Sequence, residues 1–200
     1  KNDAEAVRLF QQAAQLGDAL GMTYLGNMHQ QGRGGLAKND AEAVRLYQQA
    51  AQLGDAAGMA RLGYMHQFGL GGLAKNDAEA VRLYQQAAQL GDAAGMIGLG
   101  EMHQRGLGGL AKNDAEALKL YNRAIAAGFP ENKIKVHIDA CKAELAKQEA
   151  AASASAAASA STPVVSTSLM PAAANPMQIK QEPGDQGGMR KRIKLEPNAS

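Results

Sequence analysis

Three histidines recur at equal intervals, and their type and spacing could support chemistry. His29, His66 and His103 are 37 residues apart, and imidazole is both a common metal ligand and a general base. A zinc ion needs every ligand nitrogen within about 2.1 Å of it, whereas packed helices lie about 8–10 Å apart. We therefore interpret the three histidines as packing residues of a repeat. We predict no metal site, no cofactor and no catalytic residue, and hence no enzyme.

Two lysines near the C-terminus lie in short motifs that resemble acceptor sites for the small ubiquitin-like modifier SUMO. Each motif consists of an aliphatic residue, lysine, any residue and an acid, as in Ile179–Glu182 and Ile193–Glu196, and each is followed by proline. The predicted acceptors are Lys180 and Lys194. An unfolded segment would leave both lysines accessible to a conjugating enzyme. A chance match to so short a pattern is the alternative.

A basic cluster overlaps the second of these motifs. It comprises Arg190, Lys191, Arg192 and Lys194 and resembles a monopartite nuclear localisation signal. The alternative is a charge that keeps the segment soluble. If both motifs act, modification of Lys194 would be coupled to nuclear import. We expect an intracellular protein, and a nuclear one if the cluster is a signal.

Most of the chain consists of a 37-residue repeat whose copies align without gaps. Three copies begin at Lys1, Lys38 and Lys75, and a fourth begins at Lys112. A period of this length is typical of stacked arrays, in which each unit buries its apolar face only against its neighbours. The sequence therefore predicts an all-α solenoid of helix pairs.

Each unit is predicted to contain two helices. In the second copy, Asn39 and Glu42 resemble a capping box ahead of an amphipathic stretch that stops at Gly54. Asp55 then caps a second helix, which ends in the glycine-rich segment 69–74. Glycines inside that second helix each cost about 1 kcal/mol relative to alanine. We therefore expect close helix–helix contacts there, with no room for a Cβ atom.

The repeat pattern breaks after Gly128, which divides the chain into three parts. We predict a repeat array over 1–128 (three full units plus a half unit), a capping helix over 129–149 and a disordered tail over 150–200. The capping helix would begin at Phe129-Pro130, with proline in its first turn. The first helix has the same wide apolar face as its copies, so we expect further repeats upstream.

Charge and cysteine content restrict the classes of partner. Residues 150–200 contain five Lys or Arg and three Asp or Glu, so 1–149 contain 16 of each and are neutral. A neutral array offers no obvious surface for a phosphate backbone, and no apolar run is long enough to span a membrane. We predict no direct binding to nucleic acid or membrane. The single cysteine, Cys141, excludes an intrachain disulfide and favours a reducing compartment.

Four positions differ among all three complete copies, and they define a variable stripe on the second helix of each unit. Within a unit they are spaced i, i+1, i+4 and i+8, which places them on one helical face. The stripe consists of Thr23, Ala60 and Ile97; Tyr24, Arg61 and Gly98; Asn27, Tyr64 and Glu101; and Gln31, Phe68 and Arg105. We interpret it as a binding surface, with drift at exposed positions as the alternative. The predicted partner-binding residues are Tyr24, Asn27, Arg61, Tyr64, Phe68, Glu101 and Arg105.

Two motifs in each unit resemble the Sel-one-like repeat family. They are Leu-Gly-x-Met-His-x-x-Gly-x-Gly at Leu62–Gly71 and Asn-Asp-Ala-Glu-Ala-x-x-x-Tyr-x-x-Ala-Ala-x-x-Gly-Asp at Asn76–Asp92. The resemblance covers roughly residues 1–128. It implies a right-handed α/α solenoid whose Leu-Gly helices line a concave groove. It also implies an adaptor that assembles protein complexes.

The favoured function is an adaptor or scaffold that binds a peptide or helix of a partner protein in this groove. The tail would in addition bind the SUMO-conjugating machinery and a nuclear import receptor. Three alternatives stay open: an effector of an intracellular bacterium that acts in a eukaryotic host cell, a eukaryotic chromatin or transcription adaptor, and the regulatory repeats of an enzyme whose catalytic part lies upstream.

Overall fold

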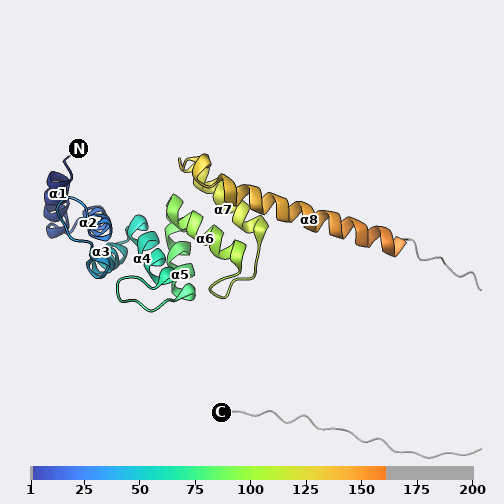
Figure 1. Cartoon of the computed structure of the whole chain (residues 1–200), viewed down its shortest axis with the longest axis horizontal. Helices are drawn as coiled ribbons and strands as arrows, with labels where there is room; N and C mark the ends of the chain where they lie inside the picture. Colours follow the sequence, from blue (N-terminus) through green and yellow to red (C-terminus); the bar gives the residue numbers. More distant parts are fainter. Residues whose placement is uncertain (1, 161–200) are drawn as a thin grey trace, which may run out of the picture. The chain divides into compact units, whose positions relative to one another are not determined.

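The computed structural model describes residues 2–160, which form α-helices and one short 3-10 helix (Figure 1). The elements are α1 (Asp3–Gln15), α2 (Ala19–Gln31), α3 (Asp40–Gln52), α4 (Ala56–Phe68), α5 (Asp77–Gln89), α6 (Ala93–Arg105), α7 (Asp114–Ala126), η1 (Glu131–Lys133) and α8 (Lys135–Ala160). The chain divides into two compact units, Lys1–Ser161 and Thr162–Ser200. The second unit lies outside the described residues.

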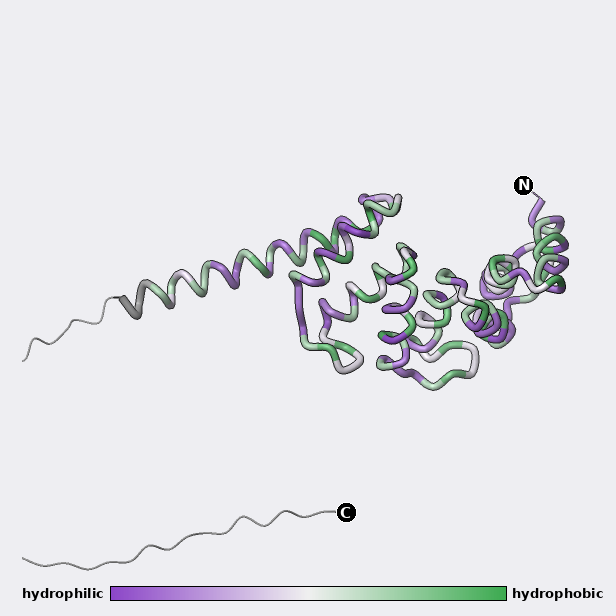
Figure 2. Tube along the Cα trace, turned by 180° about the vertical axis from the view of Figure 1, so that it is seen from behind, coloured by the Kyte–Doolittle hydropathy of each residue, from purple (hydrophilic) through white to green (hydrophobic). Residues whose placement is uncertain are grey.

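Helices that follow one another in the chain pack against each other, and α2, α4 and α6 also form a row of direct neighbours. Figure 1 shows α1 to α7 following one another in chain order, with α8 continuing past the last repeat. Apolar and polar residues are interleaved along the helices (Figure 2), as expected for helices that bury one face. The predicted all-α solenoid of helix pairs is confirmed.

The predicted capping box of the first helix of each unit is confirmed for the Asn side chain but not for the Glu side chain. Asn39 Oδ1 accepts a hydrogen bond from the Glu42 N–H at 3.0 Å. The Glu42 carboxylate does not return to Asn39, because Arg45 lies one turn further on and offers it a charged partner. The Asn39 N–H instead donates to the carbonyl of His29 at 2.8 Å. This bond attaches the start of each unit to the preceding one.

The glycines inside the second helices lie where neighbouring helices come closest, as predicted. A Cβ at Gly63 would lie 3.0 Å from Cε1 of Tyr84, and a Cβ at Gly100 would lie 2.6 Å from Cε1 of Tyr121. Each tyrosine ring therefore packs on the bare backbone of the preceding unit. This close packing compensates the helix-propensity cost of the glycines.

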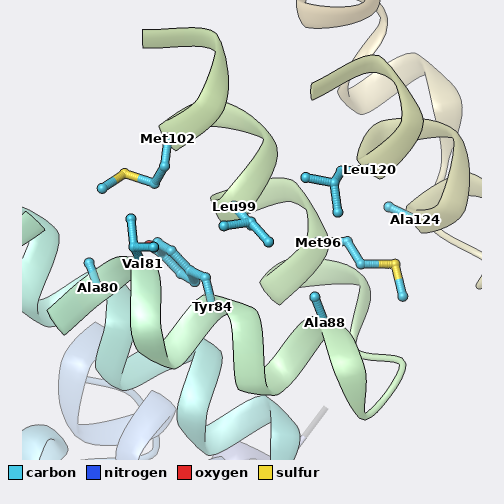
Figure 3. Close-up of a cluster of buried hydrophobic side chains, with 9 residues drawn as sticks. All are labelled: Ala80, Val81, Tyr84, Ala88, Met96, Leu99, Met102, Leu120 and Ala124. Atoms are coloured by element: carbon cyan, nitrogen blue, oxygen red, sulfur yellow. The ribbon is translucent and has the colours of Figure 1, made fainter. Parts of the chain in front are cut away.

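The core is a series of apolar clusters that each require several helices. One cluster contains nine buried residues of α5, α6 and α7 (Figure 3). Tyr84 lies there beside Val81 and Leu99, while Leu120 of α7 faces the α6 side of the cluster. Because three successive helices contribute, a single unit could not bury these side chains by itself.

An apolar stripe on the predicted C-terminal cap packs against the last repeat. Ile134, Ile138 and Cys141 are buried together with Tyr121 of α7. Lys135, Val136, Asp139 and Ala140 in the first turns of α8 are exposed, and His137 is half-buried. This segment therefore covers the apolar end of the array, which is the function expected of a terminal cap.

The bounds of the cap differ from the prediction at both ends. Pro130 precedes the 3-10 helix Glu131–Lys133, and the α-helix itself begins only at Lys135. The helix also continues to Ala160 instead of ending at 149, because the segment after 149 is rich in alanine, the strongest helix former. The rest of the predicted disordered tail, 161–200, lies outside the described residues. Across residues 2–160, no helix combines the length and apolar character needed to cross a membrane.

Candidate functional site

A pocket lies between α4 and α6, on the row of second helices. Its volume is about 460 Å³, within the range of ligand sites in proteins. Four of the seven predicted partner-binding residues line it, namely Arg61, Tyr64, Phe68 and Glu101. Arg61, Tyr64 and Phe68 come from α4, and Glu101 comes from α6. The variable stripes of two successive units thus form two walls of one pocket.

The α4 wall is aromatic and exposed. The rings of Tyr64 and Phe68 are tilted by 46° with their centroids 4.6 Å apart, and these side chains are 42% and 50% exposed. Ile97 of α6 and Phe129 of the cap add apolar surface to the lining. Exposed aromatic residues gathered around a concavity are typical of contact residues in protein interfaces.

The floor of the pocket consists of two residues that the comparison of copies does not reveal. Tyr84 and Gln67 are only 3% and 4% exposed, and both line the pocket. The Tyr84 hydroxyl donates to Oε1 of Gln67 at 2.8 Å. Nε2 of Gln67 is buried and has no hydrogen-bond partner among the described residues. Gln occupies its position in each copy, and Tyr occupies the other in every copy but the first, which has Phe10. A search for positions that differ among all copies therefore passes over both.

Gly98 allows the pocket to reach the Tyr84 ring. A Cβ at Gly98 would lie 2.5 Å from Cε1 of Tyr84, whereas the equivalent positions carry Tyr24 and Arg61. A residue larger than glycine at position 98 would therefore contact Tyr84 at the floor of the pocket. Gly98 belongs to the variable stripe, but a glycine offers no side chain to a partner, and its contribution becomes visible only in the structure.

The pocket carries one charge of each sign. Arg61 is exposed, and within residues 2–160 no carboxylate lies within ion-pair distance of it. Glu101 Oε1 lies 3.9 Å from Nε2 of His137 on α8. Burial raises the pKa of the Tyr84 hydroxyl, and the nearby negative charge of Glu101 raises it further. Tyr84 is therefore a neutral hydrogen-bond donor around pH 7.

Three predicted contact residues lie outside this pocket. The Tyr24 ring stacks on Phe10 with centroids 5.0 Å apart, and Asn27 Oδ1 accepts from the Tyr47 hydroxyl at 2.9 Å. Arg105 is exposed in the last turn of α6. Asn27 and Tyr24 thus have partners within the chain, and their contribution to partner binding stays a prediction, as does that of Arg105.

The three histidines lie in separate units and do not converge. His29, His66 and His103 are half-buried, and each has a buried Nδ1 without a hydrogen-bond partner in the described range. Their backbone carbonyls accept from the N–H groups of Asn39, Asn76 and Asn113. No group of three or more His, Cys, Asp or Glu side chains among residues 2–160 is arranged to hold a metal ion.

Two more open grooves occur along the first helices, between α1 and α3 and between α3 and α5. Each has a volume of about 490 Å³. Corresponding residues line both grooves and are identical in type. The two linings are Gln11, Ala14, Gln15, Met22, Leu25, Arg45, Leu46 and Gln49, and Gln48, Ala51, Gln52, Met59, Leu62, Arg82, Leu83 and Gln86. Because the two grooves have linings of the same residue types, they serve as a control surface for the variable pocket.

The predicted tail sites lie outside the described residues. These are the SUMO acceptors Lys180 and Lys194 and the basic residues Arg190, Lys191 and Arg192.

A row of helix pairs with a pocket of variable residues defines a repeat solenoid of the protein-interaction type. The chain matches the Sel1 repeat at residues 1–18, 19–55, 56–92 and 93–129, and it belongs to the Sel1 repeat family. The complete matched units have the same 37-residue period as the copies described above, but they begin at the second helix of each pair. Repeats of this family commonly mediate protein–protein interaction.

Two solved structures illustrate the similarity. The chain is 29% identical to c5321, a protective antigen of uropathogenic Escherichia coli strains with an SLR fold, at a TM-score of 0.54, covering 64% of this chain and 27% of that one. It is 29% identical to a Sel1 repeat protein of Oxalobacter formigenes, at a TM-score of 0.56, covering 64% of this chain and 51% of that one. The chain thus spans between about a quarter and half of these proteins. A comparison with curated proteins gave no match.

Proposed function

We propose that the chain is an adaptor that binds a peptide or helix of a partner protein along the row of α2, α4 and α6. The observation that carries the proposal is the pocket between α4 and α6. Its rim holds the variable residues Arg61, Tyr64 and Phe68, while outside the variable stripe the three complete copies differ at only three positions. Membership of the Sel1 repeat family supports a protein as the partner.

The aromatic wall supplies a physical reason for affinity. Aromatic side chains bury about 150–250 Å² each, and a few such residues contribute most of the binding energy in typical interfaces. Tyr64 and Phe68 remain about half exposed in the isolated chain, so a partner would remove much of their apolar surface from water. The neutral charge of 1–149 favours a protein ligand over a polyanion.

The test compares two triple variants of the full chain in affinity capture from eukaryotic cell lysate. The pocket variant carries Arg61→Ala, Tyr64→Ala and Phe68→Ala. The matched control carries Arg45→Ala, Gln48→Ala and Gln52→Ala on the groove side of α3. Circular dichroism first establishes that both are folded. We expect a partner that binds the wild type and the control but not the pocket variant.

Two outcomes would contradict the proposal. Equal retention by the pocket variant and the wild type would mean that the variable stripe is drift. Loss of binding by the α3 control with normal binding by the pocket variant would place the function in the repeated glutamine grooves.

The tail carries a further part of the proposal, namely nuclear import and SUMO modification of an intracellular protein. The support is the two acceptor-like motifs at Lys180 and Lys194 and the basic residues at 190–192. In eukaryotic cells, we expect Arg190→Ala, Lys191→Ala and Arg192→Ala to lower the nuclear fraction. Lys180→Arg and Lys194→Arg should together abolish SUMO conjugates. An unchanged nuclear fraction and persistent conjugates would remove these functions.

A further inference from the structure

Two polar groups at the pocket have no partner in the described part of the chain. The first is Nε2 of Gln67, on a side chain that is 4% exposed and lines the floor. The second is the guanidinium of Arg61, which lies at the rim. A buried amide without a hydrogen bond costs about 1–3 kcal/mol, so a ligand that supplied an acceptor would recover this loss.

The unsatisfied amide is a property of this pocket and not of the repeat. In the preceding unit the equivalent residue, Gln30, accepts from Tyr47 at 3.1 Å and donates Nε2 to Sδ of Met65 at 3.3 Å. Gln67 accepts from Tyr84 in the same way but has no such second bond. The Tyr84 hydroxyl bonds to one end of the Gln67 amide, and the Gln67 side chain lines a pocket that Gly98 keeps open.

The two charged residues of the pocket, Arg61 and Glu101, lie on opposite walls. Among residues 2–160, Glu101 is the only carboxylate that lines it, and its near neighbour is His137. Arg61, on the opposite wall, has no carboxylate of the described residues within ion-pair distance. A ligand with a negative charge beside an apolar group would therefore complete the α4 side, whereas a cationic group there would be repelled by Arg61.

We propose that the pocket binds a short peptide segment in which a bulky apolar residue is adjacent to aspartate or glutamate. The apolar side chain would rest against Tyr64, Phe68 and Ile97. A main-chain carbonyl of the peptide would accept from Nε2 of Gln67, and the acidic side chain would pair with Arg61. This inference rests on the proposed adaptor function and adds the chemistry of the segment that is recognised.

The probe is an array of acetylated and amidated octapeptides, tested with the full chain. Each peptide has Leu, Phe or Met at a central position, with Asp, Asn or Lys on either side and mixed residues elsewhere. The best aspartate peptide and its asparagine counterpart are then measured by fluorescence anisotropy against wild type and Arg61→Gln. We expect the wild type to prefer aspartate by about fivefold or more, as for a partly buried ion pair, and Arg61→Gln to lose this preference.

Matched variants separate the pocket from the rest of the surface. Arg82→Gln removes an exposed arginine of α5 that is not a predicted contact residue and does not line the pocket, and it should leave the preference unchanged. Gln67→Glu replaces the free donor by a negatively charged acceptor, and it should weaken binding of both peptides, the aspartate peptide most. Gln30→Glu makes the same change one unit earlier and should leave binding as in the wild type.

The outcomes distinguish the two levels of inference. Binding that depends on Tyr64 and Phe68 but shows no aspartate preference, or a preference that Arg61→Gln retains, would overturn the peptide chemistry while the adaptor function stands. Absence of binding to every peptide would overturn the peptide chemistry alone, and binding that Tyr64→Ala with Phe68→Ala does not weaken would overturn both.

Discussion

The hydroxyl of Tyr84 on α5 donates to Gln67 on α4 at 2.8 Å, and in this pair both residues are buried. The bond connects two successive units and forms the floor of the pocket at the same time. In the equivalent pairs the glutamine is only half-buried. These pairs are Tyr47 with Gln30 and Tyr121 with Gln104. Stability of the array and shape of the pocket are therefore coupled at one residue pair.

Removing this bond should destabilise the fold. We expect Tyr84→Phe to lower the free energy of unfolding by about 1–3 kcal/mol, because the Gln67 amide would lose the one hydrogen bond that it forms within residues 2–160 while remaining buried. Urea denaturation followed by circular dichroism measures the change. Tyr121→Phe is the matched control, and its loss should be smaller because water can reach the half-buried Gln104. Equal losses for the two variants would contradict this explanation.

Adding one methyl group at a close helix contact should give no gain in stability. A Cβ at residue 100 would lie 2.6 Å from Cε1 of Tyr121. Overpacking of this kind costs about 1–3 kcal/mol, which exceeds or cancels the gain of about 1 kcal/mol from higher helix propensity. We therefore expect Gly100→Ala to be neutral or destabilised in urea. A clear increase in stability would show that the tyrosine ring moves aside freely.

Alkaline pH should destabilise the fold through buried tyrosines. Burial raises the pKa of Tyr47 from an ordinary 10.0 to about 12, and burial also raises the pKa values of Tyr84 and Tyr121. Above pH 10 the unfolded chain loses phenolic protons that the folded chain retains, so stability falls as the pH rises. For Tyr47 the decrease should lie between about pH 10 and 12.

Thermal unfolding measured from pH 8 to 12 checks this expectation. Tyr47→Phe lowers stability at pH 8 because it loses the bond to Asn27, so the slope against pH is the relevant quantity. The slope of the variant should be shallower than that of the wild type. Identical slopes would mean that Tyr47 does not contribute to the alkaline transition.

Cys141 should be unreactive in the folded chain. Burial, followed by the nearby charge of Asp114, raises the pKa of this thiol from 9.0 to about 11, and the thiolate is the reactive form. Alkylation with iodoacetamide at pH 8 should be slow in the native protein and fast in urea. Rapid alkylation of the folded chain would indicate that α8 detaches from α7 under native conditions.

Much of the fold follows from local features of the sequence. The caps at Asn39 and Asp55, the amphipathic spacing and the 37-residue period together predicted the helix pairs, and the structure contains them. The end of α8 was less predictable. Alanine and serine at 150–160 carry too little apolar surface to indicate packing, yet alanine extends an existing helix without any tertiary contact.

The sequence by itself determined the repeat, the helix pairs and the stripe on which the copies differ, because these depend on residues close together in the chain or on nearest-neighbour packing. The tertiary structure decided which members of the stripe form a pocket. Asn27 is bonded to Tyr47, while Arg61 has no carboxylate within reach in residues 2–160, and the importance of Gly98 appears only once the Tyr84 ring lies against it. The physical reason is that a side chain's availability depends on contacts between residues far apart in sequence, and the repeat pattern does not record those distances.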